Sequence, residues 1–384
     1  MTSEMGKAAK KFVDEIAKAI KFQEAQEDVR RELLGHIEDN YKAAKSYGLS
    51  DENAIAESIR RMGEPKEIGA TLNAIHQPSF DFAILIPVAL LCAVGLIALR
   101  ESGWMGLQLI WMFFGTCIAA TAATLPYRKF QFLMISFYPL ALVGLFAAHF
   151  SGVSFEGQPY LSLFGLRVKM IDFGAVLMAM SLPAVIEKVS NLNWSKLAVA
   201  SMTLTPVLYF AYIGSTLPAI LFLSCGLVAV GQSRLSGWLT SAIAALAIGA
   251  IAVLARNPFL TEAQLHLSWA QNGHTDFILA TMSKNSAIYS VVVMVSLIGF
   301  FMRTFPSAVS VKNDWLRSTA VCGLTIIAIE SALGIMSNFG FTPMFTTGIN
   351  IPFLSYGGSL IIAHMLAVGV VLGCLKRKSI LHFV

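Results

Sequence analysis

Two patterns of hydrophobic positions divide the chain. From residue 6 to 76, apolar residues recur at helical spacing among dense charge. Ser50 has the side chain of a helix start, and Gly63-Glu-Pro has the residues of a helix break. We therefore expect a compact bundle of three or four helices here, with a core that includes Phe12, Ile16, Ile20, Val29, Leu33, Ile37 and Tyr41.

Beyond Pro78 the pattern changes to long apolar runs. Each run approaches the roughly 20 residues that an α-helix needs to cross a bilayer. The expected spans lie near 82–99, 104–125, 130–150, 172–186, 196–213, 215–232, 235–255, 285–305, 317–338 and 355–375. We expect an all-α, polytopic membrane protein of about ten transmembrane helices, with residues 1–78 as a soluble, cytoplasmic helical domain and 79–384 as the membrane domain.

The distribution of charge supports this division. Residues 1–78 hold 12 of the 28 Lys and Arg residues and 14 of the 23 Asp and Glu residues. Basic residues of the membrane region are scattered between apolar runs, which argues against a nucleic-acid surface. The five cysteines fall inside apolar runs without a CxxC pair, so we expect small buried side chains.

Loop charges also predict the orientation, because cytoplasmic loops are enriched in Lys and Arg. With both termini in the cytoplasm, the inner loops between spans and the C-terminal tail carry eleven basic residues, and the outer loops carry five. The outer five are Arg100, Arg167, Lys169, Arg256 and Lys284. Residues 151–171, 256–284 and 339–354 are the long outer segments, so chemistry is expected on that side.

Two motifs resemble one family. The segment Gly348-INIPFLSYGGS, at the start of the last span, resembles the C-terminal signature of the SEDS family (shape, elongation, division and sporulation), which includes RodA, FtsW and SpoVE. Gly273-HTDFILA, in the outer loop before the eighth span, resembles the His-Thr-Asp-Phe motif of the same family. Both motifs occur in the order and on the side that the family shows.

The resemblance implies a membrane glycosyltransferase that polymerises lipid II for cell shape, division or sporulation. It also implies a class B penicillin-binding protein as partner and Asp276 as the catalytic carboxylate. Chemistry supports this role, because a carboxylate just above the apolar layer can deprotonate the attacking sugar hydroxyl. The leaving pyrophosphate needs cations, for which the candidates are His274, Arg167, Lys169, Arg256 and Lys284. No motif specifies a cofactor; a divalent cation is compatible with this chemistry.

Several positions depart from the family pattern. Asn272-Gly273 replaces Pro-Glu, and Ser283-Lys284-Asn285 replaces a Glu-Glu pair. In the loop before the fourth span, Asp172 stands where the family has Glu, and Ala175 where it has Lys. These departures leave open a catalytically degenerate scaffold that regulates a penicillin-binding protein.

Other site candidates have structural alternatives. Asp276 can instead cap the short helix before the eighth span. His274 can bind pyrophosphate or orient Asp276, or it can be a solvated loop residue. Thr275, the next motif residue, is a candidate substrate-binding residue. Ser355 and Tyr356 can bind substrate, or serve as a helix cap and an interfacial aromatic residue. Gly357 and Gly358 can admit substrate to the backbone or allow close helix packing.

Glu330 is an acid inside an apolar span, where ionisable residues are costly and usually face a cavity or a partner. Asn338 and His364 are its candidate partners. A hydrogen-bonded packing residue is the structural alternative. Glu330 and the proline-containing spans also leave open a transporter of lipid-linked substrates (a flippase).

The N-terminal region resembles the small helical prefix domains that precede permeases in Gram-positive bacteria. This resemblance rests on its helical pattern and on the turn at Gly63-Glu-Pro. Such a domain is expected either to dock a cytoplasmic partner or to stabilise the first span.

Overall fold

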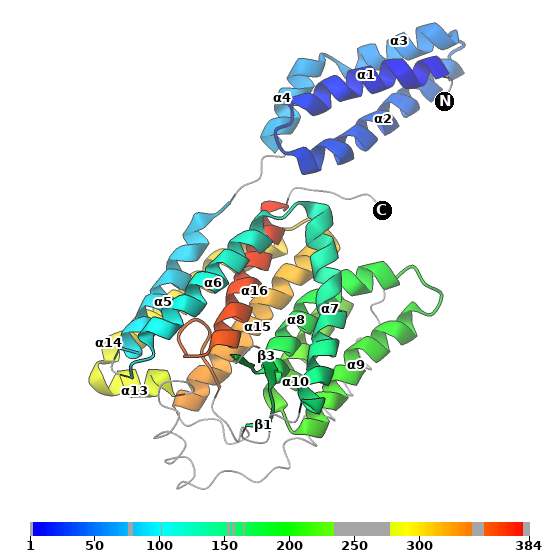
Figure 1. Ribbon diagram of the computed structural model, residues 1–384. Helices are drawn as coiled ribbons and strands as arrows, with labels where there is room; N and C mark the ends of the chain where they lie inside the picture. Colours follow the sequence, from blue (N-terminus) through cyan, green and yellow to red (C-terminus); the bar gives the residue numbers. More distant parts are fainter. Residues whose placement is uncertain are drawn as a thin grey trace. The chain divides into compact units, whose positions relative to one another are not determined.

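The computed structural model describes residues 3–75, 80–100, 102–151, 154–155, 158–163, 166–233, 277–339 and 349–378. Two compact units divide the chain: residues 1–80 with 376–384, and residues 81–375. The first is a helical bundle and the second a larger bundle of apolar helices (Figure 1).

Four helices form the first unit: α1 (Ser3–Ala19), α2 (Gln23–Ser46), α3 (Asp51–Met62) and α4 (Pro65–Ile75). Their core is apolar and includes Ile16, Ile20, Val29, Leu33 and Ile37, as the helical spacing predicts, whereas Phe12 and Tyr41 are only half-buried.

Both helix boundaries that the sequence marks are confirmed. The Ser50 side chain caps α3 by accepting a hydrogen bond from the Asn53 N–H. Helix α3 then ends before Gly63, whose φ of 96° suits glycine, and α4 begins at Pro65.

The second unit begins with the 3-10 turn η1 (Phe82–Ile84). Its helices are α5 (Leu85–Ala98), α6 (Met105–Thr124), α7 (Tyr127–Phe150), α8 (Met170–Val189), α9 (Ser195–Ile213), α10 (Thr216–Gly231), α13 (Ile278–Asn285), α14 (Ala287–Val309), α15 (Asp314–Asn338) and α16 (Gly358–Lys376). Two small antiparallel hairpins precede α8: β1 (Ser154–Phe155) with β2 (Gln158–Pro159), and β3 (Leu161–Leu163) with β4 (Leu166–Val168).

Membrane-spanning length confirms the expected fold class. Among the described residues, seven helices are long and apolar enough to cross a bilayer, and η1–α5 and α10 are shorter apolar helices at two further expected spans. The expected span at 235–255 lies outside the described residues. The chain is an all-α, multi-pass membrane protein.

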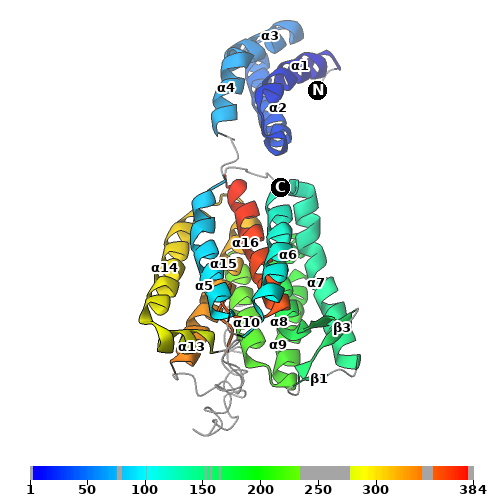
Figure 2. The same cartoon turned by 60° about the vertical axis from the view of Figure 1, so that its left-hand side comes forward.

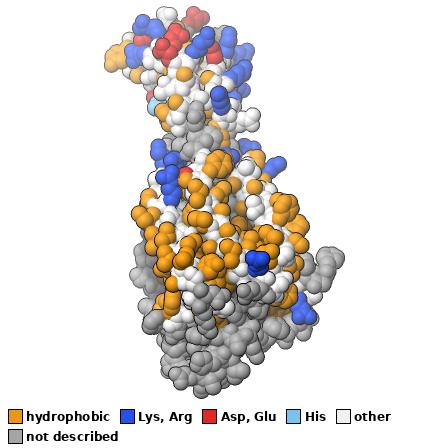
Figure 3. Space-filling model, turned by 90° about the vertical axis from the view of Figure 1, so that its left-hand side faces the viewer, with side chains coloured by type: hydrophobic (Ala, Val, Ile, Leu, Met, Phe, Trp, Pro, Cys, Tyr) orange, Lys and Arg blue, Asp and Glu red, His pale blue; other side chains and the backbone are white. Residues whose placement is uncertain are grey.

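Burial separates central from peripheral helices. Most of α8 and of α16 is buried by neighbouring helices, whereas α6, α7, α9 and α14 leave large apolar side chains exposed. Figure 3 shows such side chains as a broad apolar surface on the second unit. This surface suits contact with lipid chains.

Four of the five cysteines are buried, as expected, but Cys117 is exposed. It lies on the outer surface of α6, where an apolar run faces away from the bundle. The expectation was therefore wrong at this position, because hydropathy alone does not distinguish a lipid-facing surface from a core.

Candidate functional site

The segment 349–357, which contains Ser-Tyr-Gly, is wedged between helices. A side-chain carbon on Gly95 of α5 would lie 2.5 Å from the Leu354 carbonyl oxygen. One on Gly334 of α15 would lie 3.2 Å from the carbonyl oxygen of Ile349. The segment thus approaches the α5 backbone so closely that a side chain at Gly95 would displace it, and it packs tightly on Gly334.

Polar contacts fix the middle of this segment. The Ile351 N–H donates to the Ser355 hydroxyl oxygen over 2.9 Å, and the Gln108 amide of α6 donates to the Ser355 carbonyl over 3.3 Å. Ser355 is therefore buried and used locally. The alternative to substrate binding at Ser355 was a helix cap. The Ser355 hydroxyl does have a structural role, but it stabilises the segment that precedes α16 and does not cap that helix.

Phe353 carries backbone strain. Its φ is 67°, in the left-handed region that aromatic residues rarely adopt, and the side chain is 1% exposed. Residues in such conformations persist where the surrounding packing determines them, and they cluster at functional sites. The strained backbone at Phe353 therefore makes segment 349–357 a candidate part of the functional site.

The end of the segment faces aromatic residues of α6. The Tyr356 ring lies 5.1 Å from the Trp104 ring, centroid to centroid. At Gly358, an added side-chain carbon would lie 2.6 Å from the Trp111 ring, so this glycine allows close packing. At Gly357 the nearest atom would be 3.9 Å away, and the backbone there is accessible.

Described residues of the second motif lie close to the first. Phe277, Ile278 and Leu279 are buried, and the Ala280 N–H donates to the Asn338 side-chain oxygen over 2.9 Å. Asn338 ends α15, one turn beyond Gly334. The two motifs, more than 60 residues apart in the sequence, therefore meet on the last two turns of α15.

The hairpins lie at this same end of the bundle. Figures 1 and 2 both place α13 and the strands there. Arg167 lies opposite Ser162 in the β3–β4 pair and is exposed. Lys169 instead forms an ion pair of 2.7 Å with Asp172, which is buried in the first turn of α8. Of these two cations, Arg167 is the more accessible to an anion.

Glu330 and His364 are in contact inside the bundle. The Glu330 carboxylate of α15 and the His364 Nε2 of α16 form a buried ion pair or hydrogen bond. Asn338, the other candidate partner, donates to the Gly334 carbonyl and accepts from Ala280. His364 is therefore the partner of Glu330.

Several predicted site residues are not described. Arg256, His274, Thr275 and Asp276 lie outside the described residues. Lys284 lies in the last turn of α13, where only the backbone is described. Phe277, the first described residue of this motif, directly follows Asp276 in the sequence.

Gln108, Gly95 and Phe353 are site residues that the sequence analysis missed. Gln108 is the single amide or charged residue in the apolar run 104–125, and this isolation was a usable signal. Nothing in the sequence marks Phe353 as left-handed.

Within the described ranges, no group of three or more His, Cys, Asp or Glu side chains could hold a metal ion.

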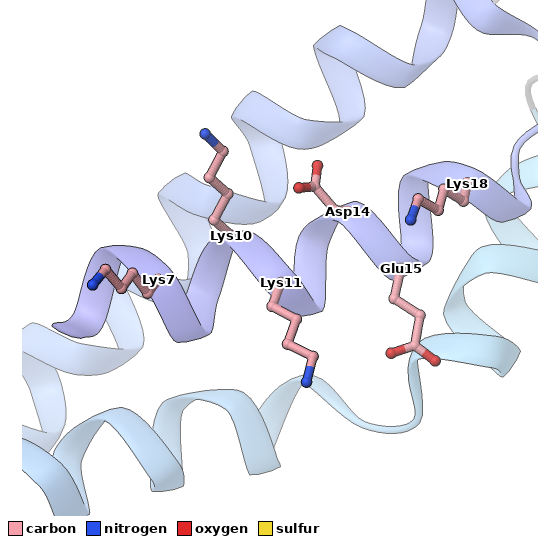
Figure 4. Close-up of a pocket in the computed structure, with 6 residues that line it drawn as sticks. All are labelled: Lys7, Lys10, Lys11, Asp14, Glu15 and Lys18. Atoms are coloured by element: carbon pink, nitrogen blue, oxygen red, sulfur yellow. The ribbon is translucent and has the colours of Figure 1, made fainter. Parts of the chain in front are cut away.

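A shallow hollow of about 560 Å³ lies along α1 in the first unit and is lined by Lys7, Lys10, Lys11, Asp14, Glu15 and Lys18. In Figure 4, Lys10 and Asp14 project from one side of α1, and Lys11 and Glu15 from the other. Side chains that diverge in this way do not enclose a substrate.

Known proteins share sequence similarity with this chain, and a family match lies in its C-terminal third. Residues 259–380 match the FtsW/RodA/SpoVE family, described as cell cycle proteins. The probable peptidoglycan glycosyltransferase FtsW of Bacillus subtilis strain 168 is 21% identical, over 76% of this chain and 89% of that protein. The FtsW of Geobacter sp. strain M18 is 31% identical, but over only 31% of this chain and 32% of its own length.

Solved structures show the same fold. The rod shape determining protein RodA of Thermus thermophilus matches with a TM-score of 0.62 at 19% identity, covering 79% of this chain and 99% of RodA. A chain from a peptidoglycan synthase complex, described as coordinating polymerization and crosslinking, matches with a TM-score of 0.64 at 18% identity, over 78% of this chain and 98% of its own. Both motifs lie within residues 259–380, so the C-terminal third of the chain is similar to the FtsW/RodA/SpoVE family, and the membrane unit has the RodA-like fold.

Proposed function

We propose that this protein is a peptidoglycan glycosyltransferase that polymerises lipid II at the outer face of the bacterial cytoplasmic membrane. One observation carries the proposal: the ends of both family motifs meet on the last two turns of α15, through Gly334 and Asn338. The FtsW relatives and the RodA-like fold support it.

In the proposed reaction, Asp276 accepts the proton of an acceptor sugar hydroxyl. The hydroxyl oxygen bonds to the anomeric carbon of the donor, and the bond from that carbon to the pyrophosphate breaks. Arg256, Lys284 and Arg167 steady the leaving polyprenyl pyrophosphate, with His274 and Thr275 beside them. Lys169 is already paired with Asp172, so its proposed role is limited to long-range electrostatic attraction of the pyrophosphate.

Tyr356 and Gly357 are proposed to border the sugar. Gly357 is partly exposed and would admit a side-chain carbon with its nearest contact at 3.9 Å, and Tyr356 lies near Trp104 with part of its side chain accessible. Ser355 and Gly358 support this surface from beneath, through the Ile351 hydrogen bond and the Trp111 contact.

The proposed topology places both termini in the cytoplasm and the two motifs outside, with residues 1–78 as the cytoplasmic domain and 79–384 as the membrane domain. A class B penicillin-binding protein is the proposed partner and would crosslink the strands. The prefix-like N-terminal domain is proposed to dock a cytoplasmic protein.

A scaffold without catalysis is the second candidate function. Ala175 stands where the family has a Lys, and it is fully buried in α8. No amine can therefore act from this position.

The deciding experiment supplies labelled lipid II to the purified full-length protein, alone and with its cognate penicillin-binding protein. Wild type is expected to form glycan strands, and Asp276→Asn to form none. Asp314→Asn is the matched control, because Asp314 begins α15 at the end of that helix opposite to Asn338. If wild type makes no strands in an assay in which a known polymerase is active, the scaffold function replaces the proposed enzymatic function.

A further inference from the structure

The Glu330–His364 pair is a buried polar contact that the proposed reaction does not use. Glu330 is 3% exposed and His364 is 2% exposed, and they join α15 to α16. Burying such groups is expensive, and apolar side chains of similar size would often stabilise the fold as well or better. A role in stability alone is therefore a poor explanation for the pair.

His364 also touches the strained segment. Its ring packs edge-on against the Phe353 ring, with centroids 5.7 Å apart and an angle of 61° between the planes. Phe353 is the residue with φ of 67°, and it keeps that conformation only while its surroundings hold it. The carboxylate of Glu330 fixes the imidazole on which Phe353 rests.

Helix α15 supports the same segment one turn further along. Gly334 follows Glu330 by four residues, so both lie on one face of α15. The backbone of Ile349 and Asn350 packs directly on Gly334. A rotation or slide of α15 against α16 would therefore move the segment from two sides at once.

We propose that Glu330 and His364 are positioning residues that hold segment 349–357 in its strained conformation, so that Tyr356 and Gly357 face the substrate. This inference rests on the proposed polymerase function for its catalytic consequence. A hydrogen bond between the two side chains suits the task because it is directional, whereas apolar contacts between two helices tolerate sliding. The pair acts through Phe353 and touches no reacting atom.

Kinetics with purified protein and lipid II provide the first test. Glu330→Ala is expected to lower kcat about tenfold or more, with little change in KM, because misplacing a site costs rate. Glu330→Gln keeps a side chain that can hydrogen-bond His364, and it is expected to retain most of the wild-type kcat. Thr319→Val is the control: Thr319 is buried in the same helix and bonds its own Trp315 carbonyl.

Cysteine labelling provides a second test that needs no polymerase activity. Gly357→Cys, in a Cys117→Ala background, places a thiol where an added side chain has room. Glu330→Ala and His364→Ala are expected to raise its maleimide labelling rate about tenfold by loosening the segment. Glu330→Gln and Thr319→Val are expected to label at the parent rate.

The double variant Glu330→Leu with His364→Leu removes both buried polar groups, and it decides the question if an alanine variant does not fold. It is expected to fold and to label fast. Labelling at the parent rate in every folded variant would overturn the inference. Absence of glycan from the wild type would remove the proposed function alone, because labelling still reports on the segment.

Discussion

Lys169 and Asp172 form a one-turn ion pair that is more buried than most surface pairs. The Asp172 side chain is 10% exposed, and its oxygen lies 2.7 Å from the Lys169 nitrogen. Removing one partner of a charged, part-buried hydrogen bond costs about 1–3 kcal/mol. We expect Asp172→Asn to lower the free energy of unfolding within this range, as measured by denaturation of the detergent-solubilised protein.

Asp314→Asn is a matched control for that prediction. Asp314 pairs with Arg317 at the same spacing and distance, but its side chain is 60% exposed. Exposed pairs contribute about 0–1 kcal/mol. Equal losses in the two variants would contradict the argument that burial makes the Lys169 pair important.

Glu57 gives a pH prediction in the N-terminal bundle. Hydrogen bonds from Arg60 and Arg61 lower the pKa of its carboxyl from 4.5 to about 2. Because the folded pKa is below the unfolded one, Glu57 stabilises the fold fully above pH 4.5, and this contribution disappears as the pH falls towards 2. The sign is therefore loss of stability on acidification.

We expect the Glu57→Gln variant to unfold at a lower temperature than wild type at pH 6, with the difference shrinking between pH 4.5 and 2. The measurement is thermal unfolding of the full-length protein across this pH range. Glu52→Gln, on the same helix, controls for loss of a carboxylate. A difference that stays constant across the range would contradict the role of the two arginines.

Single residues also show where sequence-based prediction stops. Ser50 and Gly63 act locally, so their roles at helix ends could be predicted and were confirmed. The contact between Glu330 and His364 joins two helices, and the sequence could only name His364 and Asn338 as alternatives. Phe353 was missed because its left-handed backbone is imposed by tertiary packing against an intrinsic preference.

Helix α5 limits where the segment 349–357 can lie. An alanine at Gly95 would place its side-chain carbon 2.5 Å from the Leu354 carbonyl oxygen, a distance that real side chains do not tolerate. Relief requires the segment to move, at a cost typical of overpacking, about 1–3 kcal/mol. We expect Gly95→Ala to lose most lipid II polymerisation and to unfold at a lower temperature.

Gly299→Ala in α14 is the control for this element. It is exposed and no atom lies within 4 Å of the added carbon, so the change is expected to be neutral or slightly stabilising. Wild-type activity in Gly95→Ala would show that the exact seat of the segment on α5 is not needed for catalysis.

At the level of elements, hydropathy predicted most of the membrane helices because spans are long and uniformly apolar. The described helices match the expected spans to within a few residues. Hydropathy did not predict that α8 and α16 are central while α6 and α14 are peripheral. Each of these runs is apolar on all sides, so its period says little about which face meets lipid.

For the whole molecule, the number of spans decides on which side each loop lies. With both termini in the cytoplasm and ten spans, Tyr47 and Ser310 lie inside, whereas Ser151 and Phe339 lie outside. All four residues are exposed and described. The expected span at 235–255 precedes Ser310 and Phe339, so both residues would change sides if this segment did not cross the membrane.

Single cysteines at these four positions, in a Cys117→Ala background, test this arrangement. A maleimide that cannot cross membranes is expected to label Ser151→Cys and Phe339→Cys in intact cells, and Tyr47→Cys and Ser310→Cys only after permeabilisation. If Ser310→Cys were labelled in intact cells and Phe339→Cys were not, residues 235–255 would not cross the membrane. Segments 277–280 and 349–357 would then face the cytoplasm, and the proposed reaction on externalised lipid II would lose its location.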